Sequence, residues 1–234
     1  MDRRADRRVK RPRAGDSAGH EHDQQAPDRY SRQSFLGPDA ESVLAQAVIG
    51  IVGLGGGGTH VVQQLAHVGF QHYVLYDPDQ IEATNLNRMV GATLADVRRH
   101  RSKVAIAHRV IQRVQPAAKI TGIPSQWQDE PLPLRMCDII IGCVDSVRTR
   151  RDLEAVTRRF LIPYLDIGLD VHVQPSASEP PRMAGQVALS MPSDRCLQCL
   201  GVIQERFLAD ESRRYGDAGS RPQVVWANGI LAST

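Results

Sequence analysis

A run of glycines between a strand-like and a helix-like segment constrains the fold of this chain more than any other feature. Residues 47–55 are continuously apolar and rich in β-branched side chains, which is typical of a buried strand. Five of the six residues in GLGGGG are glycine, and Gly53, Gly55 and Gly58 fit the pattern G-x-G-x-x-G. Such a turn presents backbone N–H groups to a phosphate at the positive end of a helix, which we expect to start near Thr59. The sequence therefore predicts a nucleotide-binding turn.

Strand-like and helix-like segments alternate along most of the chain. We expect further strands at 72–77, 117–123, 138–145 and 162–171, and amphipathic helices at 103–114 and 148–161. This alternation indicates βαβ units around a mostly parallel sheet. The segment QVALSMP (186–192) alternates apolar and polar residues, which favours an antiparallel strand. The predicted fold class is α/β: a Rossmann-like, doubly wound, mostly parallel sheet extended by antiparallel strands.

Composition divides the chain into a tail and one domain. Residues 1–13 hold seven basic and two acidic residues, and residues 14–28 contain no large apolar side chain. We therefore predict a disordered basic and polar tail at 1–28 and one nucleotide-binding domain at 29–234. The C-terminal segment, RPQVVWANGILAST, looks like a helix that stops without a cap, so we expect the domain to be truncated there.

Charge and hydropathy set limits on location and partners. The formal net charge of +3 is too small to indicate a nucleic-acid partner. No stretch approaches the roughly 18 apolar residues of a membrane span, and no hydrophobic signal segment follows the N-terminus. We therefore predict a cytoplasmic protein without a membrane partner.

The residues after the glycine turn bear on which nucleotide binds. Asp77 lies 24 positions after Gly53, at the end of the second predicted strand, where a carboxylate can accept hydrogen bonds from ribose hydroxyls. The turn and this acid also suit an NAD-dependent dehydrogenase, so they indicate a fold without choosing a nucleotide.

Further polar residues shift the prediction toward ATP. The segment DPDQIEATNLNR (77–88) supplies Asn85 and Arg88, and Lys103 begins a predicted helix. Asp145 closes the fourth predicted strand, at the carboxyl edge where doubly wound sheets bind ligands. Two cations and a carboxylate that can hold Mg²⁺ fit a triphosphate, whereas a redox dinucleotide carries only a pyrophosphate and needs no metal.

Six motifs, in the family's order and approximate spacing, resemble the ubiquitin-activating enzyme superfamily in its bacterial ThiF/MoeB/HesA form. They are RYSRQ (29–33), GLGGGG (53–58), D-x-D…NLNR (77–88), Lys103, CVDS (143–146) and CLQC (196–199). Family members are adenylyltransferases that act on the C-terminal Gly-Gly carboxylate of a small β-grasp protein and release pyrophosphate. The resemblance implies ATP and Mg²⁺ as cofactors and a ubiquitin-like or sulfur-carrier protein as partner.

The resemblance also implies roles for individual positions. The phosphate-facing turn would be formed by Gly53, Gly55, Gly56 and Gly58. Asp77 would hold the ribose, supported by Asp79. The catalytic residues would be Arg32, Arg88, Lys103 and Asp145, with Asn85 and Arg88 at the phosphates, Lys103 at the leaving pyrophosphate and Asp145 at Mg²⁺. In the family, Arg32 comes from the neighbouring protomer, which implies a homodimer.

The CLQC motif has the spacing of a zinc-ligand pair. In the family such a pair joins a second one in a Cys₄ site, but no cysteine follows Cys199, so Cys196 and Cys199 supply half of a Zn²⁺ site. A missing C-terminus, a lost zinc, other ligands and two core thiols without metal all remain open. Cys137 and Cys143 flank an apolar run and are predicted to be reduced core residues. Residues 200–234 contain no cysteine that could form a thioester. If the chain is whole, we expect it to pass the activated carboxylate to another protein's nucleophile.

Several alternatives remain open. An NAD-dependent oxidoreductase would leave Arg88 and Lys103 unexplained, and both could instead be surface salt-bridge partners. A non-catalytic partner subunit would bind nucleotide or dimerise without activity. A tRNA-modifying dehydratase shares the fold and the adenylation chemistry. Asp145 could cap the following helix, and Met89 replaces a glutamine common in the family, which affects the expected phosphate geometry.

Overall fold

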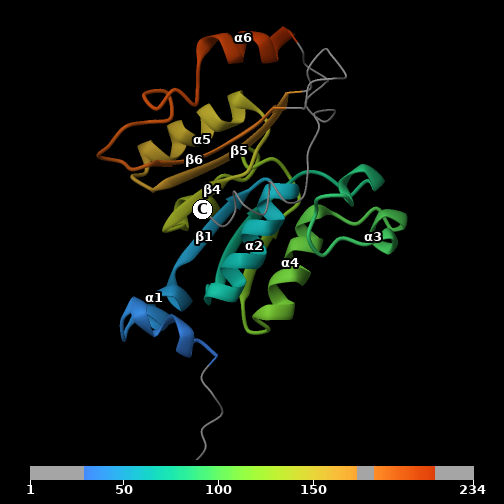
Figure 1. Cartoon of the computed structure of the whole chain (residues 1–234), viewed down its shortest axis with the longest axis vertical. Coiled ribbons are helices and arrows are strands. Elements are labelled where there is room, and N and C mark those ends of the chain that lie inside the picture. The colour runs from blue at the N-terminus through green and yellow to red at the C-terminus, as the bar shows by residue number, and fades with distance from the viewer. Residues whose placement is uncertain (1–28, 173–181, 214–234) are drawn as a thin grey trace, which may run out of the picture.

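The computed structural model describes residues 29–172 and 182–213. The predicted tail at 1–28 and the predicted C-terminal helix at 221–234 lie outside the described residues, as do residues 173–181. Figure 1 shows the described part as a twisted sheet with helices packed against it.

A six-stranded sheet forms the centre of the described region, in the order β3-β2-β1-β4-β5-β6. The strands are β1 (Val48–Val52), β2 (His72–Tyr76), β3 (Lys119–Ile123), β4 (Ile139–Gly142), β5 (Tyr164–His172) and β6 (Arg182–Ser190). Strands β1 to β5 pair in parallel, and β6 pairs antiparallel with β5. The predicted fold class is confirmed, including the antiparallel extension at the edge.

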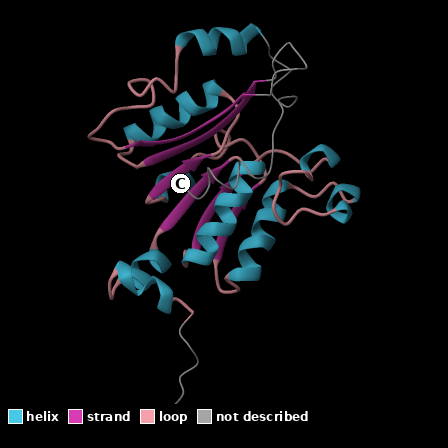
Figure 2. Cartoon of the chain, in the orientation of Figure 1, coloured by secondary structure: helices cyan, strands magenta, loops and turns pink. Residues whose placement is uncertain are grey.

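Helices connect the strands and flank the sheet (Figure 2). They are α1 (Ala40–Gln46), α2 (Gly56–Val68), α3 (Leu94–Arg98), α4 (Lys103–Val114), α5 (Val147–Arg159) and α6 (Glu205–Arg213). Short 3₁₀ turns are η1 (Ser31–Leu36), η2 (Ala83–Asn85) and η3 (Pro133–Met136). None of the described helices is long and apolar enough to cross a membrane.

The start of α2 corrects one prediction. The helix begins at Gly56, whereas the sequence predicted a start near Thr59, so Gly56, Gly57 and Gly58 belong to its first turn. Glycine is a poor helix former, but the N–H groups of a first turn have no partner within the helix. Packing of that turn against the sheet decides where the helix begins.

Alternation along the strands supplies two hydrophobic layers. In β2, Tyr73 and Leu75 join the layer under α2 and α4, while Val74 and Tyr76 join the layer that includes α5. Both faces of the sheet are therefore covered, which explains why the strands read as continuous apolar runs.

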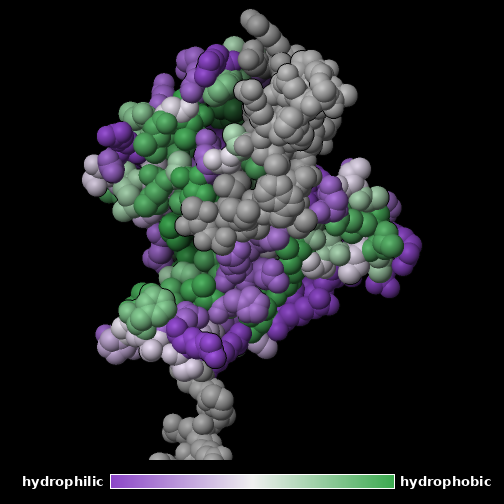
Figure 3. Space-filling model, in the orientation of Figure 1, coloured by the Kyte–Doolittle hydropathy of each residue, from purple (hydrophilic) through white to green (hydrophobic). Residues whose placement is uncertain are grey.

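The N-terminal segment is anchored at the C-terminal ends of α2 and α4. Gln115 donates a hydrogen bond to the Tyr30 hydroxyl, and Arg29 donates to the carbonyl oxygen of Val114. Beyond this anchor, Phe35 and Val43 are 82% and 63% exposed. Figure 3 shows green, hydrophobic surface at its lower left, over the segment that contains α1.

Candidate nucleotide-binding site

A pocket of about 370 Å³ lies at the carboxyl ends of the parallel strands. Its lining comes from the segments that follow β1, β2, β3 and β4, and from the start of α5. The predicted site residues that line it are Gly53, Gly55, Gly56, Asp77, Asp79, Asn85, Arg88, Lys103 and Asp145. Segments far apart in the sequence meet here because parallel strands bring their carboxyl ends to one edge.

The glycine turn is shaped by one strained position and one close contact. Gly53 has a φ of +91°, and a Cβ there would lie 2.5 Å from the carbonyl oxygen of Cys143. A Cβ at Gly58 would lie 1.9 Å from the carbonyl oxygen of Gly53. Gly58 is buried and absent from the pocket lining, so its predicted place in the phosphate-facing turn is corrected: it lets α2 approach the sheet. Gly57, which the sequence analysis did not select, lines the pocket instead.

Asp77 follows β2 and is buried at the floor of the pocket. Its Oδ2 accepts a hydrogen bond from the backbone N–H of Leu54 at 2.6 Å, and its Oδ1 accepts one from the N–H of Asp79 at 2.9 Å. Burial raises the pKa of the Asp77 carboxyl above its ordinary value, while nearby Lys103 and these N–H groups oppose the shift. Asp77 thus fixes the glycine turn against the end of β2 and remains beside the pocket as an acceptor.

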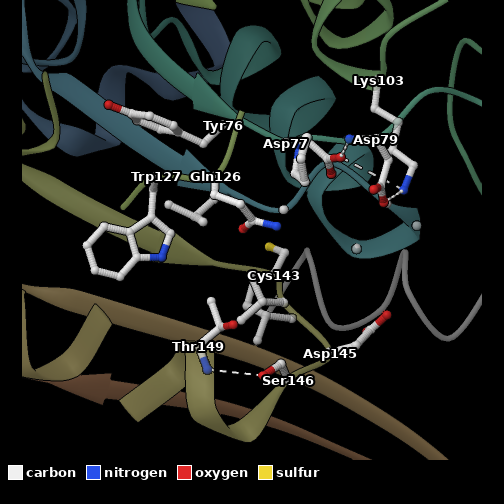
Figure 4. Close-up of a pocket in the computed structure, with 18 of the residues that line it drawn as sticks. Tyr76, Asp77, Asp79, Lys103, Gln126, Trp127, Cys143, Asp145, Ser146 and Thr149 are labelled. Carbon is white, nitrogen blue, oxygen red and sulfur yellow. Dashed lines mark hydrogen bonds and ion pairs between the residues drawn. The ribbon is translucent and has the colours of Figure 1, made fainter. Parts of the chain in front are cut away.

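Lys103 begins α4 and points back to the loop after β2. Its Nζ lies 2.6 Å from Oδ2 of Asp79 and 3.9 Å from Oδ1 of Asp77 (Figure 4). The backbone N–H of Lys103 also donates to the carbonyl oxygen of Asp79 at 3.0 Å. The ammonium is therefore held at the pocket by carboxylates, and an anionic ligand can compete with them for it.

The segment around η2 brings Asn85 and Arg88 to the pocket. The Asn85 Oδ1 accepts from the N–H of Glu82 at 3.0 Å, and the Arg88 Nη1 donates to the carbonyl oxygen of Thr84 at 2.8 Å. Thr59 of α2 accepts from the N–H of Val90, which ties this segment to the glycine turn.

Met89 points away from these polar residues. It is buried in a small cluster with Ile81 and Ile106, and it does not line the pocket. Asn85 and Arg88 line the pocket although a methionine stands where the family commonly has a glutamine.

Asp145 lies in the loop between β4 and α5, three residues after β4 ends at Gly142. The predicted strand 138–145 was therefore too long. The prediction that Asp145 could cap the helix is also wrong, because Ser146 is the N-cap and accepts from the N–H of Thr149 at 3.1 Å. Asp145 is exposed at the pocket, on the same side as Lys103 in Figure 4.

A buried arginine that the sequence analysis missed holds this loop. The Nε and Nη2 of Arg150 donate to the carbonyl oxygen of Val144 at 3.1 and 2.7 Å, and its Nη1 lies 2.7 Å from Oδ2 of Asp166. Asp166 also accepts from Tyr164 and Gln186. In the sequence, Arg150 is one of several arginines in RTRR (148–151), a segment that suggests the solvent-exposed face of a helix.

The segment after β3 adds Ser125, Gln126 and Trp127 to the lining. Their position directly after a predicted strand could have identified them as candidate site residues. Cys143 also lines the pocket, and burial raises the pKa of its thiol to about 12, so it stays protonated at neutral pH.

Arg32 does not reach the pocket of its own chain. It lies exposed in η1, next to the Tyr30 anchor at the C-terminal ends of α2 and α4. Both helices begin at the pocket, and the 13 residues of α2 span about 20 Å. The predicted role of Arg32 in a neighbouring protomer's site therefore stays a prediction.

Metal ligands are sparse in the described residues. Within 29–172 and 182–213, no group of three or more His, Cys, Asp or Glu side chains could hold a metal ion. The Cys196 and Cys199 sulfurs lie 3.2 Å apart and give two of the four ligands that structural zinc requires. Zinc therefore stays a prediction that needs ligands from elsewhere. Mg²⁺ fits better, because it commonly uses one or two carboxylates together with substrate phosphates and water, and Asp145 is such a carboxylate.

Comparison with known proteins agrees with this architecture. A model of the ThiF family matches residues 29–232. The molybdopterin-synthase adenylyltransferase of Salmonella typhimurium is 29% identical over 210 residues, covering 87% of this chain and 78% of that protein. The sulfur carrier protein ThiS adenylyltransferase of Escherichia coli is 30% identical over 132 residues, covering 54% and 52%. A tRNA threonylcarbamoyladenosine dehydratase of Saccharomyces cerevisiae is 32% identical over 145 residues, covering 57% and 31%.

Solved structures show the same fold. E. coli MccB, crystallised with AMPCPP and MccA, has a TM-score of 0.67 at 22% identity, covering 90% of this chain and 62% of that chain. E. coli tRNA N6-threonylcarbamoyladenosine dehydratase has a TM-score of 0.55 at 25% identity, covering 60% and 65%. The chain spans about half the length of several curated relatives that it matches. Since the family model matches most of its residues, the chain belongs to the ThiF family.

Proposed function

We propose that this chain binds ATP in the pocket and transfers the adenylyl group to the C-terminal Gly-Gly carboxylate of a ubiquitin-like or sulfur-carrier protein. One observation carries the proposal: the cations Arg88 and Lys103 line the same pocket as the glycine turn, with the Asp145 carboxylate beside them. A redox cofactor that carries only a pyrophosphate needs neither these two cations nor a carboxylate for Mg²⁺. Curated relatives that act as sulfur-carrier or molybdopterin-synthase adenylyltransferases support this choice.

The proposed reaction is an in-line displacement at the α-phosphorus. A carboxylate oxygen of the carrier forms a bond to that phosphorus, and the bond to the bridging oxygen breaks, so pyrophosphate leaves with the electron pair. Arg88 and Lys103 offset the negative charge that grows on the leaving group. Mg²⁺ held by Asp145 would neutralise charge on the phosphate oxygens. The remaining task of the protein is to position the two reactants.

Lys103 has a specific part in this proposal. Its ammonium is paired with Asp79 at 2.6 Å, and the phosphates would replace that carboxylate when ATP binds. The exchange keeps the lysine paired throughout, so no buried cation is left without a partner at any stage.

Calorimetric titration of the chain with MgATP and with NAD tests the choice of nucleotide. We expect MgATP to bind and NAD to bind far more weakly. Lys103→Met should weaken MgATP binding by about tenfold, because it removes a charged hydrogen-bond donor. Lys119→Met is the matched control, since Lys119 is exposed on β3 and lies outside the pocket lining. Tight NAD binding with no measurable ATP binding would contradict the proposal.

A tRNA-modifying dehydratase is the second candidate, because two curated relatives carry that name and match more than half of this chain. Both candidates begin with adenylation, so the acceptor separates them. Pyrophosphate exchange stimulated by a protein ending in Gly-Gly would favour the first, and exchange stimulated by tRNA would favour the second. ATP binding without exchange under either condition would indicate the non-catalytic subunit.

A further inference from the structure

Trp127 has an unused hydrogen-bond donor at the pocket. The side chain follows β3, lines the pocket and is only 4% exposed. Its Nε1 is buried and has no hydrogen-bond partner within the described part of the chain. A buried donor without a partner costs about 1–3 kcal/mol, so the position demands an acceptor from outside the described part of the chain.

The surroundings of Trp127 hold its ring in place. The indole packs in the hydrophobic layer with Val52 and Tyr76. The Tyr76 hydroxyl donates to the carbonyl oxygen of Glu130 at 2.5 Å, which anchors the segment after Trp127. In Figure 4 the indole nitrogen lies on the side of the ring that faces Cys143 and Thr149, which both line the pocket.

The order of the strands determines which part of a ligand would meet this donor. Along the edge of the sheet the lining runs from Trp127 after β3, to Asp77 after β2, to the glycine turn after β1, and to Asp145 after β4. Neighbouring strands lie about 4.8 Å apart, so β3 is about 10 Å from β1. With phosphates at the glycine turn and ribose at Asp77, the next strand along receives the base.

We infer that the Nε1–H of Trp127 donates a hydrogen bond to a ring nitrogen of the adenine base and so contributes to base recognition. This inference rests on the proposed ATP-binding function and deepens it. An indole N–H can only donate, so its partner must be an acceptor, and the unprotonated nitrogens of adenine are acceptors at neutral pH. The hydrogen bond would also give the buried Nε1–H a partner. Because packing already holds the indole ring in place, little side-chain entropy would be lost on binding.

The test combines one variant with nucleotide analogues. Affinities of wild type and Trp127→Phe are measured by calorimetry for ATP and for its 1-deaza, 3-deaza and 7-deaza forms, each lacking one ring nitrogen. Phenylalanine keeps an aromatic ring but removes the donor. We expect Trp127→Phe to weaken ATP binding about fivefold, the usual value of one neutral hydrogen bond. One deaza form should bind wild type about fivefold more weakly, and Trp127→Phe should bind that form as it binds ATP.

A matched control separates the donor from general packing. Tyr73→Phe also removes one polar atom from a buried aromatic residue, but the Tyr73 hydroxyl donates to the carbonyl oxygen of Phe70 and does not line the pocket. This variant should bind ATP and every analogue as wild type does. Thermal unfolding of both variants checks that each is folded.

The outcomes distinguish the inference from the function on which it rests. If wild type binds ATP and Trp127→Phe binds ATP and every analogue as tightly as wild type does, the inference is wrong and the function stands. If Trp127→Phe loses affinity by the same factor for all four nucleotides, the ring contributes by packing, and the inference is again wrong. If wild type binds no ATP, both fail.

Discussion

At the scale of single residues, Cys196 differs from Cys137 and Cys143 in how readily its thiol ionises. The N–H of Cys199 donates to the Cys196 sulfur at 3.3 Å, and this hydrogen bond lowers the pKa of the Cys196 thiol. Burial raises the pKa of Cys137 and of Cys143 to about 12. The thiolate is the reactive form, so iodoacetamide at pH 7.5, after reduction and chelation of metal, should modify Cys196 well before Cys137 or Cys143. Mass spectrometry of the digested protein gives the order, and modification of Cys143 at the rate of Cys196 would contradict it.

Two glycines of the turn offer a second residue-scale prediction. A Cβ at Gly55 meets nothing within 4 Å, and Gly55 lines the pocket, whereas a Cβ at Gly58 would overlap the carbonyl oxygen of Gly53. Gly55→Ala should leave stability within about 0.5 kcal/mol of wild type while weakening ATP binding about tenfold by blocking close approach of phosphate. Gly58→Ala should lower the free energy of unfolding by about 2 kcal/mol. Chemical denaturation and calorimetry measure both, and equal loss of stability in the two variants would refute this division of roles.

At the scale of elements, Arg150 connects the start of α5 to β5 and to the loop that carries Asp145. Arg150→Met leaves the buried Asp166 carboxylate without its cation and frees the Val144 carbonyl oxygen. We expect the free energy of unfolding to fall by about 3 kcal/mol at pH 8. Arg151→Met is the control on the same helix: its side chain is half exposed, and its ion pair with Asp152 should contribute less than about 1 kcal/mol.

The stability of Arg150→Met should depend on pH in a direction that follows from the pKa of Asp166. Burial already raises the pKa of Asp166 above 3.8, and Arg150 opposes this shift. Loss of the arginine raises the pKa further, so the folded variant binds more protons than the unfolded chain above pH 3.8. Its stability therefore increases as pH falls, and the deficit relative to wild type should shrink between pH 8 and pH 5. A deficit that stays constant over this range would contradict the assignment of the loss to the Asp166 charge.

Sequence patterns predicted most of the elements that form the sheet. Apolar runs identified most of the parallel strands, alternation of apolar and polar residues identified β6, and period-3.6 spacing identified α4 and α5. Each of these elements buries side chains in a hydrophobic layer. The patterns missed η1, α1 and α3, which are short and contribute few buried side chains. They also misplaced the start of α2, because glycine propensity opposes a helix that packing against the sheet enforces.

Site residues were predictable where topology alone brings them together. Asp77 and Asp145 follow parallel strands, so their meeting at one edge could be expected. Trp127 and Arg150 could not be identified in this way, because their importance lies in burial and in partners far along the chain. The sequence alone suggests that a tryptophan after a strand belongs to the core, and only the structure shows that its N–H has no partner among the described residues.

At the scale of the whole molecule, the position of Arg32 predicts complementation between inactive variants. Arg32 lies at the end of α2 opposite its own pocket, so it could act only on another copy of the chain. We propose a homodimer in which each site combines Arg32 of one copy with Lys103 of the other. Arg32→Ala and Lys103→Met should each be inactive, and an equal mixture should recover about one quarter of wild-type activity, because half the dimers have one intact site. No recovery after subunit exchange, shown independently by mass, would contradict supply from the second copy.

Exchange of radiolabelled pyrophosphate into ATP, with and without a β-grasp protein that ends in Gly-Gly, tests the central claim most directly. The measurement reports formation of an acyl-adenylate, and it separates adenylation from nucleotide binding alone. Asp145→Ala is measured in parallel, because the exposed Asp145 carboxylate is the proposed Mg²⁺ ligand. The account predicts label in ATP only when the carrier's free carboxylate is present, and a loss of about a hundredfold or more in Asp145→Ala. Exchange at the wild-type rate in Asp145→Ala, or label that enters ATP without any carboxylate acceptor, would contradict it.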